Sequence, residues 1–257
     1  MTRWGPWSAH ALDVSALTHV GRRENNEDAF YADEANAVFV VADGMGGYHG
    51  GEVASALVVS SVGAFTLRNA EDGNATWPWG LEPGRSFVES FLTVALRLAN
   101  REVYARRKGP LAQMGSTAVA IAFDGDAVVL AHIGDSRIYR LREGTLEQMT
   151  RDHSLVEELA RMGAREQPVG ISHVITRAVG FGPRTTADVQ RIDVLEGDAY
   201  LLCSDGLSDP LDADDIALAL SCKRASDACE ALVRAAYAAG GTDNITALVV
   251  RVGERTA

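Results

Sequence analysis

The sequence has few cysteines, and they form no recognisable pattern. Cys203, Cys222 and Cys229 are an odd number and include no C-x-x-C pair, which argues against a disulfide framework or a zinc knuckle. The N-terminus lacks the continuous apolar stretch of a signal peptide, and no later run approaches the roughly 20 apolar residues that span a bilayer. We therefore expect a cytoplasmic protein that does not associate with membranes.

Basic residues are outnumbered by acidic ones. The chain has 24 Lys and Arg against 35 Asp and Glu, which gives a net charge of −11. A surface of this sign repels phosphate backbones and anionic lipids, so we expect no nucleic-acid partner. The excess acid has two interpretations, since it either keeps the protein soluble or includes carboxylates that converge on cations.

The length of 257 residues and the hydrophobic content of 47% predict one large globular domain. We expect this domain over residues 11–253, after an N-terminal tail over 1–10 that is either loose or packed back through its tryptophans. Hydrophobic patterns predict strands at about 11–20, 28–33, 37–42, 116–123, 126–133, 136–142, 189–194, 198–204 and 245–252. They predict helices at about 51–67, 85–107, 152–162, 211–220 and 225–239.

The order of these elements favours a layered fold. Strands group together and helices form two pairs, which argues against the regular alternation of a doubly wound parallel sheet. Short turn sequences separate the three runs between residues 116 and 142, and this pattern predicts an antiparallel meander. We therefore expect mainly antiparallel sheets with helices outside.

Three aspartates, Asp43, Asp135 and Asp205, follow apolar runs and adjoin glycines. A carboxylate at the end of a buried strand is costly to desolvate unless a positive group meets it, and glycine allows close approach. One Asp-Gly pair alone usually marks a turn, but the repetition, together with Asp243 beside two glycines, favours a cation site. Oxygen ligands without Cys or His select Mg²⁺ or Mn²⁺ over zinc.

The segment Asp43-Gly-Met-Gly-Gly47 is rich in glycine but does not match known phosphate-binding loops. It lacks the Lys of a P-loop and the G-x-G-x-x-G spacing. Its leading acid repels a phosphate unless a metal lies between them, so metal-mediated phosphate binding fits it best. Neither G-x-S-x-G nor H-E-x-x-H occurs in the chain, and Cys203 has no basic neighbour, so a nucleophilic side chain is unsupported.

A second charged segment, residues 22–28, precedes a predicted strand. Successive strand residues point to opposite faces, so Glu27 and Asp28 cannot both bind a metal directly with ease. We expect one of them to reach a metal directly or through water, and the other to orient a bound water or a neighbouring group. The alternative is a solvated loop.

Together, these motifs resemble those of the metal-dependent protein phosphatases of type 2C, in particular their compact bacterial members. The resemblance runs from about Leu12 to Val252 and rests on ordered motifs: Arg23-Glu-Asn-Asn-Glu27-Asp28, Asp43-Gly-Met-Gly-Gly47 with Gly51-Glu52, Gly115-Ser-Thr117, His132-Ile-Gly-Asp135-Ser-Arg137, Asp152-His-Ser154, Ser204-Asp205-Gly-Leu207 and Gly241-Thr-Asp243-Asn244. It implies an α+β fold, a four-layer α-β-β-α sandwich with two mainly antiparallel sheets face to face, helical pairs outside and a flap at about 150–182.

The resemblance also implies a two-metal site for Mn²⁺ or Mg²⁺. Asp43 would bridge both metals, Gly44 would offer its carbonyl to the second, and Glu27 would bind that second metal partly through water. Asp205 and Asp243 would hold the first metal.

Three further roles follow from the same resemblance. Asp135, with Asp205, would hold a third and weaker metal, Asp28 would act from behind the ligands, and Arg23 would grip the substrate phosphate. The planar fork of an Arg suits phosphate oxygens and keeps its charge at any working pH. A water between the two metals would then attack phosphorus in line, without a phosphoenzyme.

One position departs from the pattern. Eukaryotic relatives carry a His where this chain has Met45, and that His is a favoured acid for the leaving alkoxide. A metal-bound water, His49 or His153 could replace it, or the chain could prefer better leaving groups. Tyr48 stands where bacterial relatives often have His, and we assign it no role.

The function implied is a Ser/Thr phosphoprotein phosphatase that reverses signalling by Ser/Thr kinases. Its partners would be phosphorylated proteins, namely such kinases and their substrates, and we expect a monomer. Two alternatives are a catalytically silent binding module, which the loss of a metal aspartate would support, and a small-molecule phosphatase, which would need a deeper pocket.

Overall fold

The computed structural model describes residues 7–46, 50–72, 75–163 and 174–256. One group of strands comprises β2 (Asp28–Asp33), β3 (Val38–Met45), β4 (Gly115–Ser116), β5 (Ala118–Asp124), β6 (Ala127–Ile133) and β9 (Asp188–Asp193). These form a sheet in the order β2-β3-β5-β6-β9, with β4 paired to β3. The neighbouring strands run antiparallel.

A second sheet lies face to face with the first. Its strands are β1 (His10–His19), β7 (Arg137–Arg142), β8 (Thr145–Gln148), β10 (Ala199–Cys203) and β11 (Ile245–Arg255), in the order β1-β11-β10-β7-β8. Its strand pairs are also antiparallel.

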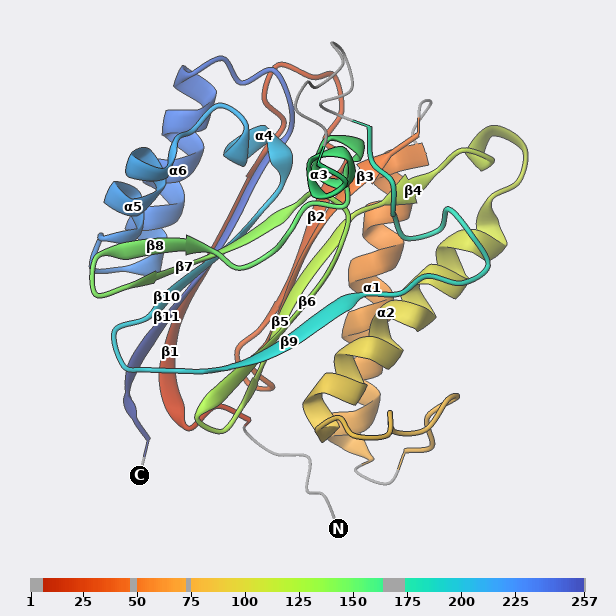
Figure 1. The fold of residues 1–257 in the computed structure, drawn as a ribbon, viewed down its shortest axis with the longest axis horizontal. Coiled ribbons are helices and arrows are strands. Elements are labelled where there is room, and N and C mark those ends of the chain that lie inside the picture. The colour runs from red at the N-terminus through yellow and green to blue at the C-terminus, as the bar shows by residue number, and fades with distance from the viewer. Residues whose placement is uncertain (1–6, 47–49, 73–74, 164–173, 257) are drawn as a thin grey trace.

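Two pairs of helices cover the outer faces (Figure 1). The first pair, α1 (Gly50–Glu71) and α2 (Phe87–Arg106), packs on the sheet that contains β3 and β5. The second pair, α5 (Ala213–Leu220) and α6 (Ala225–Ala238), packs on the sheet that contains β11. The expected four-layer α-β-β-α sandwich is therefore confirmed. Two shorter helices, α3 (Leu155–Arg161) and α4 (Asp205–Ser208), and a 3-10 turn (Gly109–Leu111) complete the described elements.

Strand β3 shows how the sequence produces these layers. Because side chains alternate across a strand, Val38 and Val40 pack in the core beneath α1 and α2. Phe39 and Val41 point the other way and join the core between the two sheets. By the same alternation, Asp43 continues the row of Phe39 and Val41, so its carboxylate faces the space between the sheets.

The core between the sheets is wholly apolar along its middle. It includes Phe39 and Phe123 from one sheet and Tyr200, Leu202 and Leu248 from the other, each fully buried. Phe123 meets Phe39 and Tyr200 edge to face, with ring centroids 6.3 Å apart in both pairs. Polar residues replace apolar ones where the strands reach the end of the sandwich that carries α4, and the buried Asp198, bonded to the Tyr200 hydroxyl, does so just before the start of β10.

The predicted meander over residues 116–142 is wrong in one respect. β5 and β6 do form a hairpin, but β6 pairs with β9 and β7 pairs with β10 and β8. Gly134 and Asp135 therefore do not form a hairpin turn, since they lie where the chain crosses from one sheet to the other. A second difference concerns Asp43, which does not end its strand, because β3 continues to Met45 and pairs there with β4.

The start of the described chain is integrated into the domain. Trp7 is buried against Phe87 and Phe91 of α2, with ring centroids 6.1 and 5.0 Å away. Of the two options for the tail, Trp7 therefore packs back, whereas Trp4 lies outside the described residues.

The helix α1 alters one expectation from the sequence. By length and composition it is apolar enough to cross a membrane, although no such segment was expected. However, 56% of that apolar window is buried inside the domain, where α1 packs against β3 and α2. These contacts are those of a core helix in a globular protein.

The base of the expected flap lies at the same end of the sandwich as α4 and β4 (Figure 1). Its helix α3 is capped by Ser154, the residue before its first turn, whose hydroxyl accepts a hydrogen bond from the Glu157 N–H at 3.3 Å. Isolated bridges join Ser154 to Ile175 and Ser116 to Val179. The middle of the flap, with Pro168, lies outside the described residues.

Candidate metal centre

A cleft of about 470 Å³ lies at the end of the sandwich where the chain connects the two sheets. Both sheets and the flap contribute to its walls, which are formed by Arg23, Glu24, Asn25, Glu27, Asp43, Gly44, Met45, Gly46, Ile175, Asp205, Asp243 and Asn244. Six of the eight residues expected at the site therefore meet in one cleft. The other two, Asp28 and Asp135, do not line it.

Asp43 is held by its backbone on β3. Its N–H donates to Thr117 Oγ1 at 3.0 Å, and its carbonyl accepts from the Thr117 N–H at 2.8 Å. The Thr117 hydroxyl in turn lies 2.7 Å from Ser136 Oγ, so the connection between the two sheets helps to fix Asp43. The carboxylate itself is left to face the cleft.

Gly44 and Gly51 allow the chain to pack unusually closely at this point. A Cβ on Gly44 would lie 2.0 Å from the Gly51 carbonyl oxygen, and one on Gly51 would lie 2.5 Å from Glu27 Oε2. The Gly44 N–H donates to the Glu27 carbonyl at 3.0 Å. These contacts bring the Glu27 carboxylate against the first turn of α1, which a side chain at either glycine would prevent.

Asp28 lies behind the cleft and is 9% exposed. Its Oδ2 accepts hydrogen bonds from the hydroxyls of Ser204 and Thr246, both at 2.7 Å, which come from the opposite sheet. Its Oδ1 is buried and has no partner among the described residues. Burial, reinforced by the nearby charges of Asp205 and Asp243, raises the pKa of Asp28 to about 7.

The other acids perturb one another in the same way. Burial, with the charges of Asp28, Asp205 and Asp135, holds the pKa of Asp43 well above its usual range. Burial and the charge of Asp205 raise the pKa of Asp135 to about 7. The pKa of Asp205 is also raised, first by burial and then by the charges of Asp209 and Asp243. Without cations, so many carboxylates cannot all ionise at low cost.

Asp205 and Asp243 come from the sheet that contains β10 and β11. Asp205 is the first residue of α4 and follows the last residue of β10 after Ser204, and Asp243 lies two positions before the first residue of β11. Arg23 binds the segment that carries Asp243, with its Nη2 2.6 Å from Asp243 Oδ2 and its Nε donating to the Thr242 carbonyl at 3.1 Å. The Arg23 side chain is 56% exposed, so its guanidinium is accessible to a ligand in the cleft.

Three polar residues that were given no role from the sequence hold the site together. Ser204 and Thr246 donate hydrogen bonds to the Asp28 carboxylate, as described above. The Asn244 Oδ1 accepts from the Glu27 N–H at 2.8 Å, and its Nδ2 donates to the carbonyls of Val20 and Asn25 at 2.9 Å. Strand alternation could have found Ser204 and Thr246, because both continue the inward rows of β10 and β11.

The donor set fits hard divalent cations. The acids converge from both sheets and include two buried oxygens without partners, Asp28 Oδ1 and Asp135 Oδ1, among the described residues. The cleft is lined by no Cys or His within those residues. Carboxylate and carbonyl oxygens suit Mg²⁺ or Mn²⁺, and a cation would offset the repulsion that raises these pKa values.

The structure separates the candidates for a proton donor. Met45 lines the cleft but has no proton to give. The His153 ring is 8% exposed, lies outside the cleft lining and is engaged by Gly134 and Asp188, so it does not reach a bound substrate. His49 and Tyr48 lie outside the described residues.

Comparison with known sequences finds close similarity along most of the chain. The family model described as protein phosphatase 2C matches residues 17–240. The serine/threonine protein phosphatase PstP of Mycobacterium tuberculosis is 37% identical over 236 residues, which are 90% of this chain but only 43% of PstP. The protein phosphatase PhpP of Streptococcus pneumoniae is 33% identical over 256 residues, which are 96% of this chain and 100% of PhpP.

Solved structures show the same similarity. The catalytic domain of PstP in complex with two manganese ions superimposes with a TM-score of 0.80 at 36% identity, over 95% of this chain and 99% of that domain. The serine/threonine phosphatase of S. agalactiae superimposes with a TM-score of 0.80 at 31% identity, over 94% and 99% of the two chains. The chain thus spans less than half of full-length PstP but 99% of its catalytic domain.

Proposed function

Because the chain belongs to the protein phosphatase 2C family, we propose that it is a metal-dependent phosphatase that hydrolyses phosphoserine and phosphothreonine in proteins. One observation carries this proposal: acids from both sheets meet in one cleft, where the pKa values of Asp43 and Asp205 are raised, with an accessible Arg at its rim. Such a site places carboxylates that need a cation beside an Arg that can bind a phosphate. The manganese-bound catalytic domain of PstP has this fold.

The residues of the site divide the work. Asp43, Asp205 and Asp243, with Glu27 and the Gly44 carbonyl, would hold two Mn²⁺ or Mg²⁺ ions. When bound, these ions supply a water of lowered pKa for in-line attack and neutralise charge on the phosphate. The remaining tasks fall to groups of the chain that are not ligands.

Arg23 would bind the substrate phosphate. Its guanidinium is shared between the Asp243 carboxylate and the Thr242 carbonyl, and it can exchange the carboxylate for two phosphate oxygens in the same fork geometry. Asp28, fixed by two hydroxyl donors, would hold the charge and orientation of Asp43 from behind.

We further propose that the substrates are phosphorylated proteins, including Ser/Thr kinases and the proteins that they modify. The rim of the cleft supports this, because Arg23, Glu24 and Asn25 are exposed there and can be reached by a chain lying on the surface. We propose that the protein acts as a monomer in the cytoplasm of a bacterium. The relatives reported above are bacterial, and the three cysteines are unpaired and at least partly buried.

Hydrolysis of a phosphothreonine peptide by the purified protein tests the proposal. We expect phosphate release with Mn²⁺ or Mg²⁺ and none with EDTA, and an inactive Asp205→Asn variant serves as the control for contaminating phosphatases. No release with any metal, from protein shown by circular dichroism to be folded, would overturn the proposal in favour of a binding module. Release from small phosphate esters but not from phosphopeptides would instead indicate a small-molecule phosphatase.

A further inference from the structure

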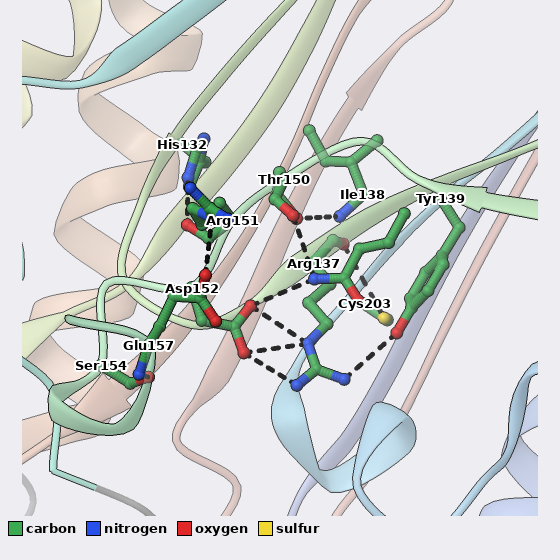
Figure 2. Close-up of polar contacts among 11 residues, drawn as sticks. His132, Arg137, Ile138, Tyr139, Thr150, Arg151, Asp152, Ser154, Glu157 and Cys203 are labelled. Atoms are coloured by element: carbon green, nitrogen blue, oxygen red, sulfur yellow. Dashed lines mark hydrogen bonds and ion pairs between the residues drawn. The ribbon is translucent and has the colours of Figure 1, made fainter. Parts of the chain in front are cut away.

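The connection between β6 and β7 carries Asp135 and is held on both sides by the base of the flap. On one side, Arg137 binds Asp152, with Nε 3.1 Å from both carboxylate oxygens and Nη2 2.8 Å from Oδ2. Figure 2 shows the Arg137 guanidinium between the Asp152 carboxylate and the Tyr139 hydroxyl. This forked ion pair joins the residue two places after Asp135 to the first residue of the Asp152-His-Ser154 motif.

On the other side, His153 binds both polar groups of the Gly134 backbone. The Gly134 N–H donates to Nδ1 of the His153 ring at 3.0 Å, and the backbone N–H of His153 donates to the Gly134 carbonyl at 2.9 Å. The His153 carbonyl in turn accepts from the Thr176 N–H at 2.8 Å, on the far side of the flap. Gly134 has φ of +105°, and a Cβ there would lie 2.7 Å from Thr117 Cγ2, so its backbone is closely confined.

These bonds fix the proton on His153. Because Nδ1 accepts from an N–H, it carries a lone pair, and the neutral ring must carry its hydrogen on Nε2. Nε2 makes no hydrogen bond within the described residues, but the Asp188 Oδ2 charge lies 3.3 Å away and favours this tautomer, and Arg177 holds Asp188 Oδ1 at 2.6 Å. Burial lowers the pKa of His153 and keeps the ring neutral.

The same tautomer excludes a metal between His132, His153 and Asp188, whose potential ligand atoms lie within 4.8 Å of one another. Nε2 of His153 is protonated and has no lone pair to offer. The His132 ring stacks on that of His153, with centroids 4.6 Å apart, and its Nε2 donates to the Arg151 carbonyl at 2.8 Å. The pair is therefore a packed support for the Gly134 backbone.

We propose that His153 is a positioning residue for Asp135, acting through its Nδ1 bond to the Gly134 N–H. The proposal rests on the proposed function, in which Asp135 helps to hold a third cation. Asp135 Oδ1 is buried without a partner among the described residues, so its orientation depends on the peptide from which it extends. By fixing that peptide, His153 sets where the carboxylate points and makes the base of the flap part of the cation site.

Two replacements of His153 separate this role from a merely structural one. Asn places its Oδ1 near the position of Nδ1, so His153→Asn keeps an acceptor for the Gly134 N–H. Gln extends to the position of Nε2, so His153→Gln keeps a group facing Asp188 but loses the acceptor. Both variants lose the ring that stacks on His132 and should lose similar thermal stability in EDTA, which circular dichroism can measure.

Titration with Mn²⁺ at pH 7, followed by calorimetry and by the electron paramagnetic resonance signal of free Mn²⁺, then tests the proposal without substrate. We expect His153→Gln to weaken the lowest-affinity Mn²⁺ site by about 10-fold, as is usual when a partner that orients a ligand is lost. We expect His153→Asn to bind as the wild type does, and Asp135→Asn to lose that site. In the Asp135→Asn background, His153→Gln should have no further effect.

A variant away from the core guards against a failure of His153→Gln to fold. Asp188 is exposed on β9, so Asp188→Ala should fold, and without its carboxylate the His153 tautomer is less strongly fixed. We expect a weakening of the same site by roughly 3-fold, with Asp193→Ala at the other end of β9 as the matched control.

Equal Mn²⁺ binding by the wild type, His153→Gln and Asp188→Ala overturns the proposal, as does equal weakening by His153→Asn and His153→Gln. If the wild type binds no Mn²⁺ at all, the proposed function itself is wrong.

Discussion

Asp28 and Asp43 lie directly opposite each other in the antiparallel pair of β2 and β3. Both therefore face the space between the sheets, where Asp28 is bound by hydroxyls of the other sheet and Asp43 lines the cleft. Like charges opposite each other destabilise a strand pair. The pairing is tolerable when one of the two acids is protonated or when cations lie beside them.

This relationship predicts how pH affects the metal-free protein. The pKa values of Asp28 and Asp135 rise from the model-compound value of 3.8 to about 7 in the fold, so the native state binds more protons than the unfolded state between these values. Stability should therefore fall as pH rises from about 4 to 7. Since one pKa unit is worth about 1.4 kcal/mol, the contribution of one such group is on the order of a few kcal/mol.

Urea unfolding in EDTA at pH 5 and pH 8, for the wild type and Asp135→Asn, measures this contribution. Burial lowers the pKa values of His132 and His153, which makes stability rise with pH near 6, but this effect is common to both proteins. The variant should lose less stability than the wild type over the same range. An identical pH dependence in the two proteins would show that ionisation of Asp135 does not cause the loss of stability at higher pH.

Asp205→Asn should abolish turnover with Mn²⁺ while the protein remains folded. Loss of a ligand should cost more than the 10- to 100-fold that is usual, as an order of magnitude, for partners that only orient one. In EDTA the variant should be at least as stable as the wild type, because Asp205 is repelled by its neighbours. Asp214→Asn, an exposed change in the first turn of α5, is the control, and a fully active Asp205→Asn would contradict the assignment.

Arg23→Ala should raise the KM for a phosphopeptide more than it changes the affinity for Mn²⁺. A hydrogen bond to a charged group is worth about 2 kcal/mol, which corresponds to roughly 30-fold in KM. Arg22→Ala is a suitable control, because Arg22 is also exposed but does not line the cleft. If the two variants have the same KM, Arg23 does not bind the phosphate.

Gly51→Ala should weaken Mn²⁺ binding, because the added Cβ would lie 2.5 Å from Glu27 Oε2 and 2.8 Å from the Gly44 carbonyl carbon. Both groups would have to move away from their present positions. Gly50→Ala, whose Cβ would come no closer than 3.2 Å to Met114 Cβ, is the matched control in the same turn. Calorimetric titration with Mn²⁺ compares the two, and equal affinities would place Glu27 and Gly44 outside the cation site.

Much of the fold could be predicted because its signals are local. The all-apolar runs of β3, β5, β6 and β10 are visible in the sequence, as are the paired helices. The crossing between β6 and β7 was not predictable in this way, because a glycine and an aspartate after a strand favour a turn whichever sheet the next strand joins. The short elements β8 and α4 have too few residues to show a period.

In the site, too, the residues with local sequence signals could be predicted and their long-range contacts could not. The acids and Arg23 were identified from motifs, and the structure brings six of the eight expected residues into one cleft. Strand alternation indicates that Ser204 and Thr246 face inward, but their hydrogen bonds to Asp28 could not be foreseen, because they lie 176 and 218 residues from it in the chain. The metal-binding roles themselves remain predictions for the experiments above.

The cleft takes its acids from both sheets, whereas the apolar core joins those sheets along their middle. The apolar core therefore holds the two sheets together whether or not cations are bound, whereas at the cleft the acids of the two sheets are joined only when cations bind them. We expect removal of the cations to loosen the two sheets at that end, so that the Mn²⁺ concentration sets the local rigidity of the domain as well as its activity. Amide hydrogen exchange at the ends of β2 and β11 would then report on the metal supply.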